Sequence, residues 1–543
     1  MKKNNTFRRA AALVAALSIT VSLAAPAFAG TYYIDDGDIT IIKNENGSQT
    51  IKQQGKEDCT DQVGDETIIT THKKAITTLE SDLEGPAAED SGFGPVVEDN
   101  YQPAPPAQPE DAEEPKDADQ PEDDDQKNAE ESENDEEQKD ADRQENTDRK
   151  ESAEEPEDAD RKESAGQQAQ LQQAAPAAAP AASTPGNGFC KNIITVINNF
   201  ADTVLNLTLK DVKIDVSNTG WENHAGKAAL NVQGEGNVEI ELDGNNELKS
   251  GNLKAGLEKN TSEGTLTLKD DKEAGSGSLT AEGGGWAAGI GGSDGKGTNN
   301  IIISGGTVTA EGGNYGAGIG SGGGSYDGGD HITITGGTVN ATGGAWGAGI
   351  GGGYGDDSDH ITITGGTVTA EGGNYGAGIG GGYGGVGDHI TISGGAVTAI
   401  GGRVGGAGIG GGYSGDGDHI TITGGKVTAE GGNSGAGIGG GYWGRGRNIT
   451  VSGAAQVTAV AGKSDEDNFS GFGATIGDGY NGGDTRDDDG NLISYGSGKE
   501  VQADISGLTT GYIHHIIYNL DGSLKREWWE PERPQPNPES PQP

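Results

Sequence analysis

Eight aromatic residues recur at regular intervals in the second half of the chain. They flank a repeated Gly-Ala-Gly-Ile-Gly box or its variant with Ala in the first position: Trp286, Tyr315, Trp346 and Tyr375 precede it, and Tyr354, Tyr383, Tyr413 and Tyr442 follow it. Tyr and Trp combine an apolar ring face with a polar edge, which suits a sugar ring that offers C–H groups and hydroxyls. The spacing therefore predicts two outward rows of rings that bind carbohydrate. The alternative is that the rings cover glycine-rich corners whose backbone needs a lid.

An Asp-His dipeptide recurs in the same region with spacings of 29, 29 and 30 residues. Its acidic members are Asp330, Asp359, Asp388 and Asp418. Stacked carboxylates could bind Ca²⁺, which takes oxygen ligands. We favour the alternative, in which each Asp caps free backbone amides at the start of a strand and each His is simply exposed. Calcium is therefore the one cofactor that the sequence leaves open.

The sequence offers little support for catalysis. It contains no HExxH motif, no nucleophile elbow and no spacing typical of a Ser/His/Asp triad. Polysaccharide lyases and hydrolases with a β-helix fold set acids and a basic residue in a groove, whereas Arg403, Lys426, Arg445 and Arg447 lie within regular repeats. Such regularity argues against a unique active site, so we expect that the protein is not an enzyme.

A repeat of about 29 residues must position these side chains. The unit at 360–383 contains three short β segments separated by Gly-Gly corners. Strand alternation places one apolar set on a common face: Ile361, Ile363, Val368, Ala370, Ala377 and Ile379. Stacked units would bury this set as interior ladders. We therefore predict an all-β fold, a right-handed three-sided parallel β-helix. A propeller is disfavoured, because each blade needs about 40 residues.

Glycine content and charge exclude several classes of protein. The chain has 543 residues, of which 100 are Gly, and 85 acidic against 37 basic side chains give a formal charge of −48. An excess of acids argues against nucleic acid as a partner, because neutralising phosphates needs Lys and Arg. Many glycines disfavour a helical bundle. A net charge of −19 lies between residues 110 and 163, in a stretch almost free of bulky apolar side chains.

The composition divides the chain into segments. Residues 1–29 have a basic start, a short apolar stretch and an Ala-Phe-Ala cleavage motif, which indicates a secretory signal peptide. Residues 30–80 carry short β-like runs, and 85–188 form a disordered, acidic and Ala/Pro-rich low-complexity segment. The predicted β-helix occupies 191–480, with regular repeats from 280. A polar segment with a short strand follows at 481–525, and a Pro-rich tail at 526–543.

Several motifs resemble those of one known family. They are Asn-Val-Glu-Ile-Glu-Leu-Asp-Gly at 237–244, Ala-Gly-Leu-Glu-Lys-Asn at 255–260, Gly-Ser-Leu-Thr-Ala-Glu-Gly-Gly at 277–284 and the repeated Gly-Ala-Gly-Ile-Gly-Gly-Gly. These motifs are similar to those of secreted clostridial carbohydrate-binding β-helix proteins. The resemblance implies export from a Gram-positive bacterium, polysaccharide binding and calcium in the fold. No family-defined binding residue matches a position here. The chain ends without a Leu-Pro-x-Thr-Gly wall anchor, so we expect a secreted protein whose attachment to the cell wall stays open.

The resemblance extends to residues 32–41, which look like the opening strand of the family. Residues 30–80 would then form the first part of the β-helix, and the acidic segment would be an insertion within it. Cys59 and Cys190 flank that segment, and an exported chain permits disulfides. We expect the two cysteines to pair at the base of the insert. Two free thiols are the alternative.

These features together predict non-catalytic carbohydrate binding outside the cell. The expected partner is a polysaccharide or a cell-wall or host glycan, with no nucleic acid and no integral membrane contact. A structural or adhesive surface stalk without a glycan ligand is the main alternative. A polysaccharide lyase or hydrolase ranks last.

Overall fold

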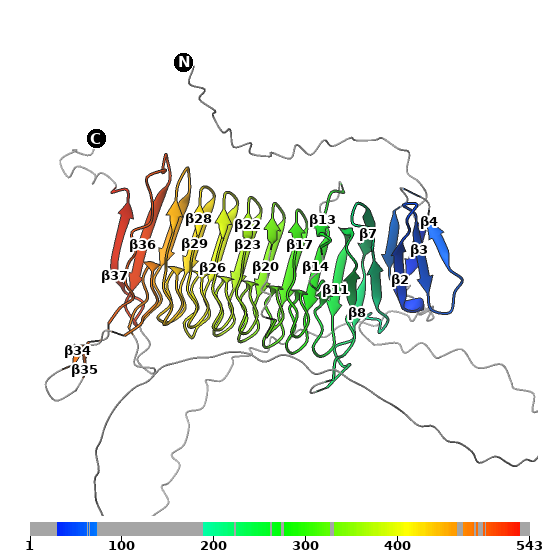
Figure 1. Cartoon of the computed structure of the whole chain (residues 1–543), viewed down its shortest axis with the longest axis horizontal. Helices are drawn as coiled ribbons and strands as arrows, with labels where there is room; N and C mark the ends of the chain where they lie inside the picture. Colours follow the sequence, from blue (N-terminus) through cyan, green and yellow to red (C-terminus); the bar gives the residue numbers. More distant parts are fainter. Residues whose placement is uncertain are drawn as a thin grey trace, which may run out of the picture. The chain divides into compact units, whose positions relative to one another are not determined.

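The chain forms an all-β parallel solenoid whose coils stack along one axis (Figure 1). The computed structural model describes residues 30–61, 63, 66–72, 188–221, 224–260, 263–272, 276–325, 331–463, 471–482, 485–486, 492–494 and 496–532. The predicted signal peptide at 1–29, residues 73–187 with nearly all of the acidic segment, and residues 533–543 of the Pro-rich tail lie outside the described residues.

Three long sheets form the sides of the solenoid. Sheet A contains, in spatial order, β1 (Gly30–Tyr33), β5 (Thr67–Thr70), β7 (Val204–Lys210), β10 (Asn237–Asp243), β13 (Leu266–Lys269), β16 (Ile301–Ile303), β19 (Ile332–Ile334), β22 (Ile361–Ile363), β25 (Thr391–Ile392), β28 (Thr421–Ile422) and β31 (Thr450–Val451). Sheet C contains β8 (Lys213–Asp215), β11 (Asn245–Lys249), β14 (Ser278–Glu282), β17 (Thr307–Glu311), β20 (Thr338–Thr342), β23 (Thr367–Glu371), β26 (Ala396–Ile400), β29 (Lys426–Glu430), β32 (Gln456–Val460), β36 (Tyr512–Tyr518) and β37 (Leu524–Glu530).

Sheet B closes the third side. It contains β4 (Cys59–Asp61), β3 (Gln49–Gln53), β2 (Ile39–Lys43), β6 (Ile194–Ile197), β9 (Leu230–Gln233), β12 (Leu257–Glu258), β15 (Ile290–Gly291), β18 (Ile319–Gly320), β21 (Ile350–Gly351), β24 (Ile379–Gly380), β27 (Ile409–Gly410), β30 (Ile438–Gly439) and β33 (Ile476–Gly477). A separate two-stranded sheet pairs β34 (Thr485–Arg486) with β35 (Leu492–Ser494). Helical structure among the described residues is limited to the 3-10 turn η1 (Ile34–Asp36), and no helix in that part of the chain is long and apolar enough to cross a membrane.

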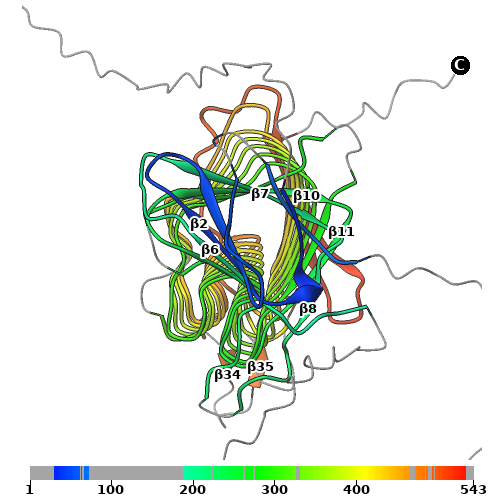
Figure 2. The ribbon, with the colours of Figure 1, turned by 90° about the vertical axis from the view of Figure 1, so that its right-hand side faces the viewer.

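Each coil runs through sheets A, C and B in turn. In the coil that contains β22, β23 and β24, every strand pairs in parallel with its counterpart one repeat later. The register aligns identical positions, for example Val368 with Val397. Viewed along the axis, the coils superimpose on one another (Figure 2). The three-sided parallel β-helix predicted from the repeat is confirmed.

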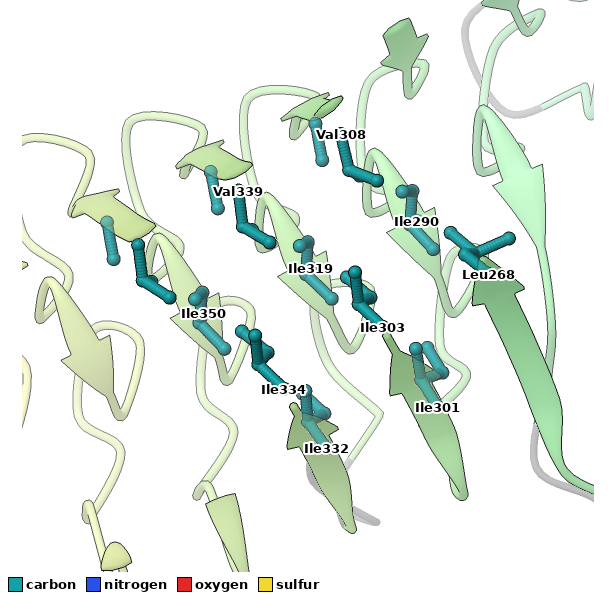
Figure 3. Close-up of a cluster of buried hydrophobic side chains, with 14 of the residues drawn as sticks. Leu268, Ile290, Ile301, Ile303, Val308, Ile319, Ile332, Ile334, Val339 and Ile350 are labelled. Carbon is teal, nitrogen blue, oxygen red and sulfur yellow. The ribbon is translucent and has the colours of Figure 1, made fainter. Parts of the chain in front are cut away.

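The core consists of ladders of the same side chain in successive coils. The six inward positions predicted for one repeat are all buried: Ile361, Ile363, Val368, Ala370, Ala377 and Ile379. Figure 3 shows Ile290, Ile319 and Ile350 stacked in one such ladder. Burying a branched aliphatic side chain contributes roughly 1.5–3 kcal/mol, so the repeated set can stabilise a rod that is poor in large side chains.

Close stacking also explains one class of glycine. At Gly376 a Cβ atom would collide with the carbonyl oxygen of Gly347 in the preceding coil. No side chain can therefore stand between these backbones, and from Gly316 onward the first position of the box is always Gly.

The N-terminal strands share sheets with strands from beyond the acidic segment. β1 pairs in parallel with β5, and β5 pairs with β7. β2 pairs with β6, so Ile39 lies beside Ile194. β1, β2 and β5 thus belong to the first coils of the same solenoid, and β3 and β4 extend sheet B beyond β2 as antiparallel strands.

The C-terminal end differs from the prediction. β36 falls within the predicted short strand, but β37 occupies residues 524–530, part of which was assigned to the Pro-rich tail. β37 pairs antiparallel with β36, and Trp529 and Trp528 stack on His514 and His515 with ring centroids 3.8 Å and 4.4 Å apart. These contacts between distant residues extend the folded chain past residue 525.

Candidate functional site

Two rows of aromatic rings stand at neighbouring corners of the solenoid. The first ring row (Trp286, Tyr315, Trp346 and Tyr375) follows strands of sheet C, and the second ring row (Tyr354, Tyr383, Tyr413, Tyr442 and Tyr480) follows strands of sheet B. Within the rows the ring centroids of Trp286 and Tyr315 are 3.9 Å apart, and those of Tyr383 and Tyr413 are 5.4 Å apart. The rings stack because each occupies the same place in its coil, one strand spacing from the next.

The two ring rows also interlock. Tyr383 meets Trp346 at a centroid distance of 5.0 Å and an angle of 74°, and it meets Tyr375 at 5.6 Å and 84°. The backbone N–H of Tyr383 donates to the carbonyl of Trp346 at 2.9 Å, and that of Tyr413 donates to the carbonyl of Tyr375 at 2.8 Å. Edge-to-face and offset-stacked contacts are the favourable ones between aromatic rings. The rows therefore form one continuous aromatic cluster.

The rings of the cluster are only partly accessible to solvent. The eight rings predicted from spacing are all partly buried, and their neighbours in the row cover the ring faces. Burial, with a further contribution from Tyr442, Tyr383 and Tyr375, raises the pKa of Tyr413, so its hydroxyl keeps its proton and can donate. The same rings pack against glycine-rich corners, for example Trp286 and Tyr315 against Gly323. This is the arrangement that the alternative interpretation of the sequence predicted.

Two aromatic residues at the C-terminal end of the cluster were missed. Tyr480 follows Ile476 by four residues, as Tyr442 follows Ile438, but the longer coil between them hides the spacing. Trp443 has a φ of +66° at a corner that Gly355 and Gly384 occupy in earlier coils. Its ring is 51 % exposed and stands at 85° to Tyr442 with 5.3 Å between centroids. The signal in the sequence was Tyr-Trp-Gly at 442–444 in place of Tyr-Gly or Tyr-Ser.

A left-handed φ for a bulky side chain is unusual and costs free energy. Here it holds an indole in solvent next to the ring rows. Strained residues of this kind cluster at functional sites, which makes Trp443 the part of the aromatic cluster most suited to contact a ligand with its ring face.

The Asp-His row runs along the corner before sheet A. The rings of His331, His360, His389 and His419 stack in parallel, with centroids 4.8–4.9 Å apart. All four have positive φ values between 45° and 57°, and Asn300 and Asn448 extend the row with φ values of 56° and 49°. Asn and His tolerate this conformation better than most side chains. Asp330 lies outside the described residues.

The carboxylates of this row alternate with imidazoles. Asp388 Oδ1 lies 3.1 Å from Nδ1 of both His389 and His419, and it accepts the backbone N–H of His389 at 2.8 Å. Asp418 Oδ1 likewise accepts the backbone N–H of His419. Burial alone would raise the pKa of Asp418, but hydrogen bonds from Asn448 and the His419 amide outweigh it and lower the pKa. These contacts are the amide caps that we favoured.

Asp359 differs from its counterparts. Its Oδ1 is shielded from solvent and has no hydrogen-bond partner, although Nδ1 of His360 and Nδ1 of His389 each lie 3.4 Å away. Because the neighbours are nitrogens rather than further oxygens, this donor set differs from the oxygen cage that Ca²⁺ prefers. In two groups of side chains, the potential metal-ligand atoms lie within 4.8 Å of one another: Asp359 with His360 and His389, and Asp388 with His389 and His419.

An open groove lies beside the C-terminal end of the Asp-His row. Its lining includes His419, Asn448, Gln502 and Asp504. Asp504 is the one carboxylate that lines it, and hydrogen bonds from Ser506 lower its pKa. Arg447, one of the basic residues considered for catalysis, does not line this groove. Its Nη2 donates a hydrogen bond to Asp416 Oδ2 at 2.6 Å.

The expected disulfide is absent. Both cysteines are free thiols. Cys59 is exposed in β4, whereas Cys190 is buried, and its backbone forms an isolated parallel β-bridge with Ile214 of sheet C. Burial raises the pKa of Cys190 to about 11, so this thiol is inert at neutral pH. The base of the insert is instead held by strand pairing, as between β5 and β7.

Comparison with known proteins supports the fold. A family model described as a beta helix repeat matches residues 301–323, 332–354, 361–383, 390–413 and 420–442. These ranges contain seven of the eight rings predicted from spacing, and the last four begin directly after an Asp-His dipeptide. The chain is a parallel β-helix protein. The repeat matches support no narrower family, so the resemblance to clostridial proteins stays a prediction. No curated protein and no solved structure matched the chain.

Proposed function

We propose that this β-helix protein binds polysaccharides outside the cell and catalyses no reaction on them. The observation that carries the proposal is the aromatic cluster, which ends in the half-exposed indole of Trp443. A hydroxyl-rich chain laid along the solenoid could accept and donate hydrogen bonds at the row of ring edges. Trp443 would supply the ring face on which one sugar stacks.

The absence of paired carboxylates in the open groove supports a non-catalytic role. Glycoside hydrolysis uses two carboxyl groups on opposite sides of the bond to be cleaved. Among the residues that line the groove, only Asp504 carries a carboxylate, and its lowered pKa disfavours the protonated form that a general acid needs. The signal-like residues 1–29 support export.

Substitution of Trp443 tests the proposal. We expect Trp443→Gly to weaken binding to a glycan that the intact chain retains by about 3- to 10-fold, the equivalent of roughly 0.5–1.5 kcal/mol for one aromatic contact. Gly occupies the same corner at 355 and 384, so the variant should fold and melt no lower than the parent. Screening against plant, mucin and cell-wall glycans followed by calorimetry measures the effect.

Trp221 supplies the matched control, because it is 67 % exposed and lies outside the ring rows. Trp221→Ala should bind as the parent does. Equal binding by Trp443→Gly and the parent would remove Trp443 from the site. Retained adhesion to cells or matrix without any glycan binding would favour the surface stalk, and new reducing ends or unsaturated products would establish an enzyme.

A further inference from the structure

We propose that Asp359, His360 and His389 bind one divalent transition-metal ion of the Zn²⁺, Ni²⁺ or Cu²⁺ class. The proposal is independent of carbohydrate binding, since these side chains stand on the Asp-His row and not on the ring rows. Among the described residues of the row, it concerns the one corner at which a carboxylate oxygen has no hydrogen-bond partner.

The distances fit the edges of a coordination tetrahedron. Asp359 Oδ1 lies 3.4 Å from Nδ1 of His360 and 3.4 Å from Nδ1 of His389. With metal–nitrogen and metal–oxygen bonds of about 2.0–2.2 Å, neighbouring ligand atoms of a tetrahedral site are about 3.3–3.6 Å apart. Two of the three edges therefore already have the required length.

The state of Asp359 distinguishes this corner from the next. Its Oδ1 is screened from water and has no hydrogen bond, although the side chain as a whole is 46 % exposed. At the following corner Asp388 Oδ1 accepts the His389 amide and lies in hydrogen-bonding contact with His419 Nδ1 at 3.1 Å. Asp388 is therefore satisfied without an ion, whereas a cation would satisfy Asp359. Because both groups contain His389, the two groups together can bind only one ion.

The two imidazoles can close the third edge. Their rings are parallel within 8°, with centroids 4.9 Å apart. Because a metal ion lies in the plane of each imidazole that binds it, both rings must rotate out of this stack until their Nδ1 atoms face one ion. Side-chain exposures of 50 % for His360 and 48 % for His389 leave room for this movement. Solvent would occupy the fourth position. Two imidazole nitrogens with one carboxylate oxygen suit Zn²⁺, Ni²⁺ or Cu²⁺, and they do not suit Ca²⁺.

Zinc binding by the full, untagged chain tests the site. The chain is stripped with a chelator and titrated with Zn²⁺ in excess Ca²⁺, which occupies carboxylate-only sites. We expect one Zn²⁺ per chain, and Co²⁺ in its place should give the visible absorption of a tetrahedral site. His360→Asn, His389→Asn and Asp359→Asn should each weaken binding by about 10-fold or more. Asn holds the same corner at 300 and 448, so the histidine variants should fold.

Asp388→Asn and His331→Asn are the matched controls and should bind as the parent does. Unchanged affinity in Asp359→Asn would overturn the proposal, as would an equal loss in Asp388→Asn. The described residues contain a third group, Asp35, Asp36 and His72, near the N-terminus. Loss of binding in His72→Asn would place the ion there and overturn the proposal as well.

Discussion

Backbone conformation decides which residue types the corners accept. The corner before sheet A has positive φ at Asn300, His331, His360, His389, His419 and Asn448. The corner after the second ring row has positive φ at Gly355, Gly384, Ser414 and Trp443. A side chain in the left-handed region costs about 1–2 kcal/mol, less for Asn, and nothing for Gly. Histidine can thus occupy this corner because it tolerates a positive φ. Stacking of the coils then brings the imidazoles and carboxylates of successive corners together.

Two glycines of one coil should respond differently to a side chain. Gly376→Ala should destabilise the protein by about 1–3 kcal/mol, because its Cβ would strike the Gly347 carbonyl and force neighbouring coils apart. Gly384→Asn should cost less than about 1 kcal/mol. At Gly384 φ is +76°, and a Cβ there meets no atom within 4 Å. Chemical denaturation of both variants measures the difference. Equal losses would show that the close approach of the coils at Gly376 does not set the cost of a side chain there.

Elements with a local signal could be predicted, and those with distant partners could not. β22, β23 and β24 were expected because alternation and corner residues lie within one repeat. β37 was missed because its place depends on antiparallel pairing with β36 and on stacking of Trp528 on His515. The ring rows were expected from spacing. Their interlocking was not, since ring orientation depends on contacts between coils such as that of Trp346 with Tyr383.

The hairpin of β36 and β37 contains a buried histidine that should make its stability depend on pH. Burial lowers the pKa of His515 to about 4, with smaller contributions from His514 and Arg526. The unfolded chain takes up this proton near pH 6.5 and the folded chain only near pH 4. Stability from His515 is therefore complete above about pH 6.5 and falls as pH decreases toward 4, by roughly 3 kcal/mol in total.

Exchange of His515 isolates this effect from its neighbours. Thr475 Oγ bonds both His515 Nδ1 and Glu500, and Glu530 lies 4.0 Å from His515 Nε2. Burial raises the pKa of Glu500, which acts in the opposite direction as pH falls. His515→Gln keeps a partner for Thr475 without a titrating ring. The protection factors of the β36 amides, which remove the intrinsic effect of pH on hydrogen exchange, should fall between pH 7 and pH 4 in the parent and fall less in the variant. An identical fall in both would assign the pH dependence to the carboxylates.

At the scale of the molecule, stacked coils make a rod whose free ends are its weak points. Each coil contacts mainly its two neighbours, so stability is nearly a sum over coils and their interfaces. An uncovered end would present open strand edges and a cross-section of the core to other chains. At the C-terminal end β36 covers β32, with Ile513 buried beside Val457, and β37 forms the outer edge. Lys525, Arg526 and Glu527 place exposed charges on that edge.

Removal of this cap should make the rods associate with one another. A chain that ends after residue 511 leaves the β32 edge and the core around Val457 open, so we expect a lower melting temperature and association that grows with concentration. A chain that ends after residue 532 keeps both strands and should behave as the parent does. Light scattering and thermal denaturation of the three chains decide the question. Full solubility and an unchanged melting temperature for the shorter chain would show that the coils withstand an open end, and that the charges of β37 serve another purpose.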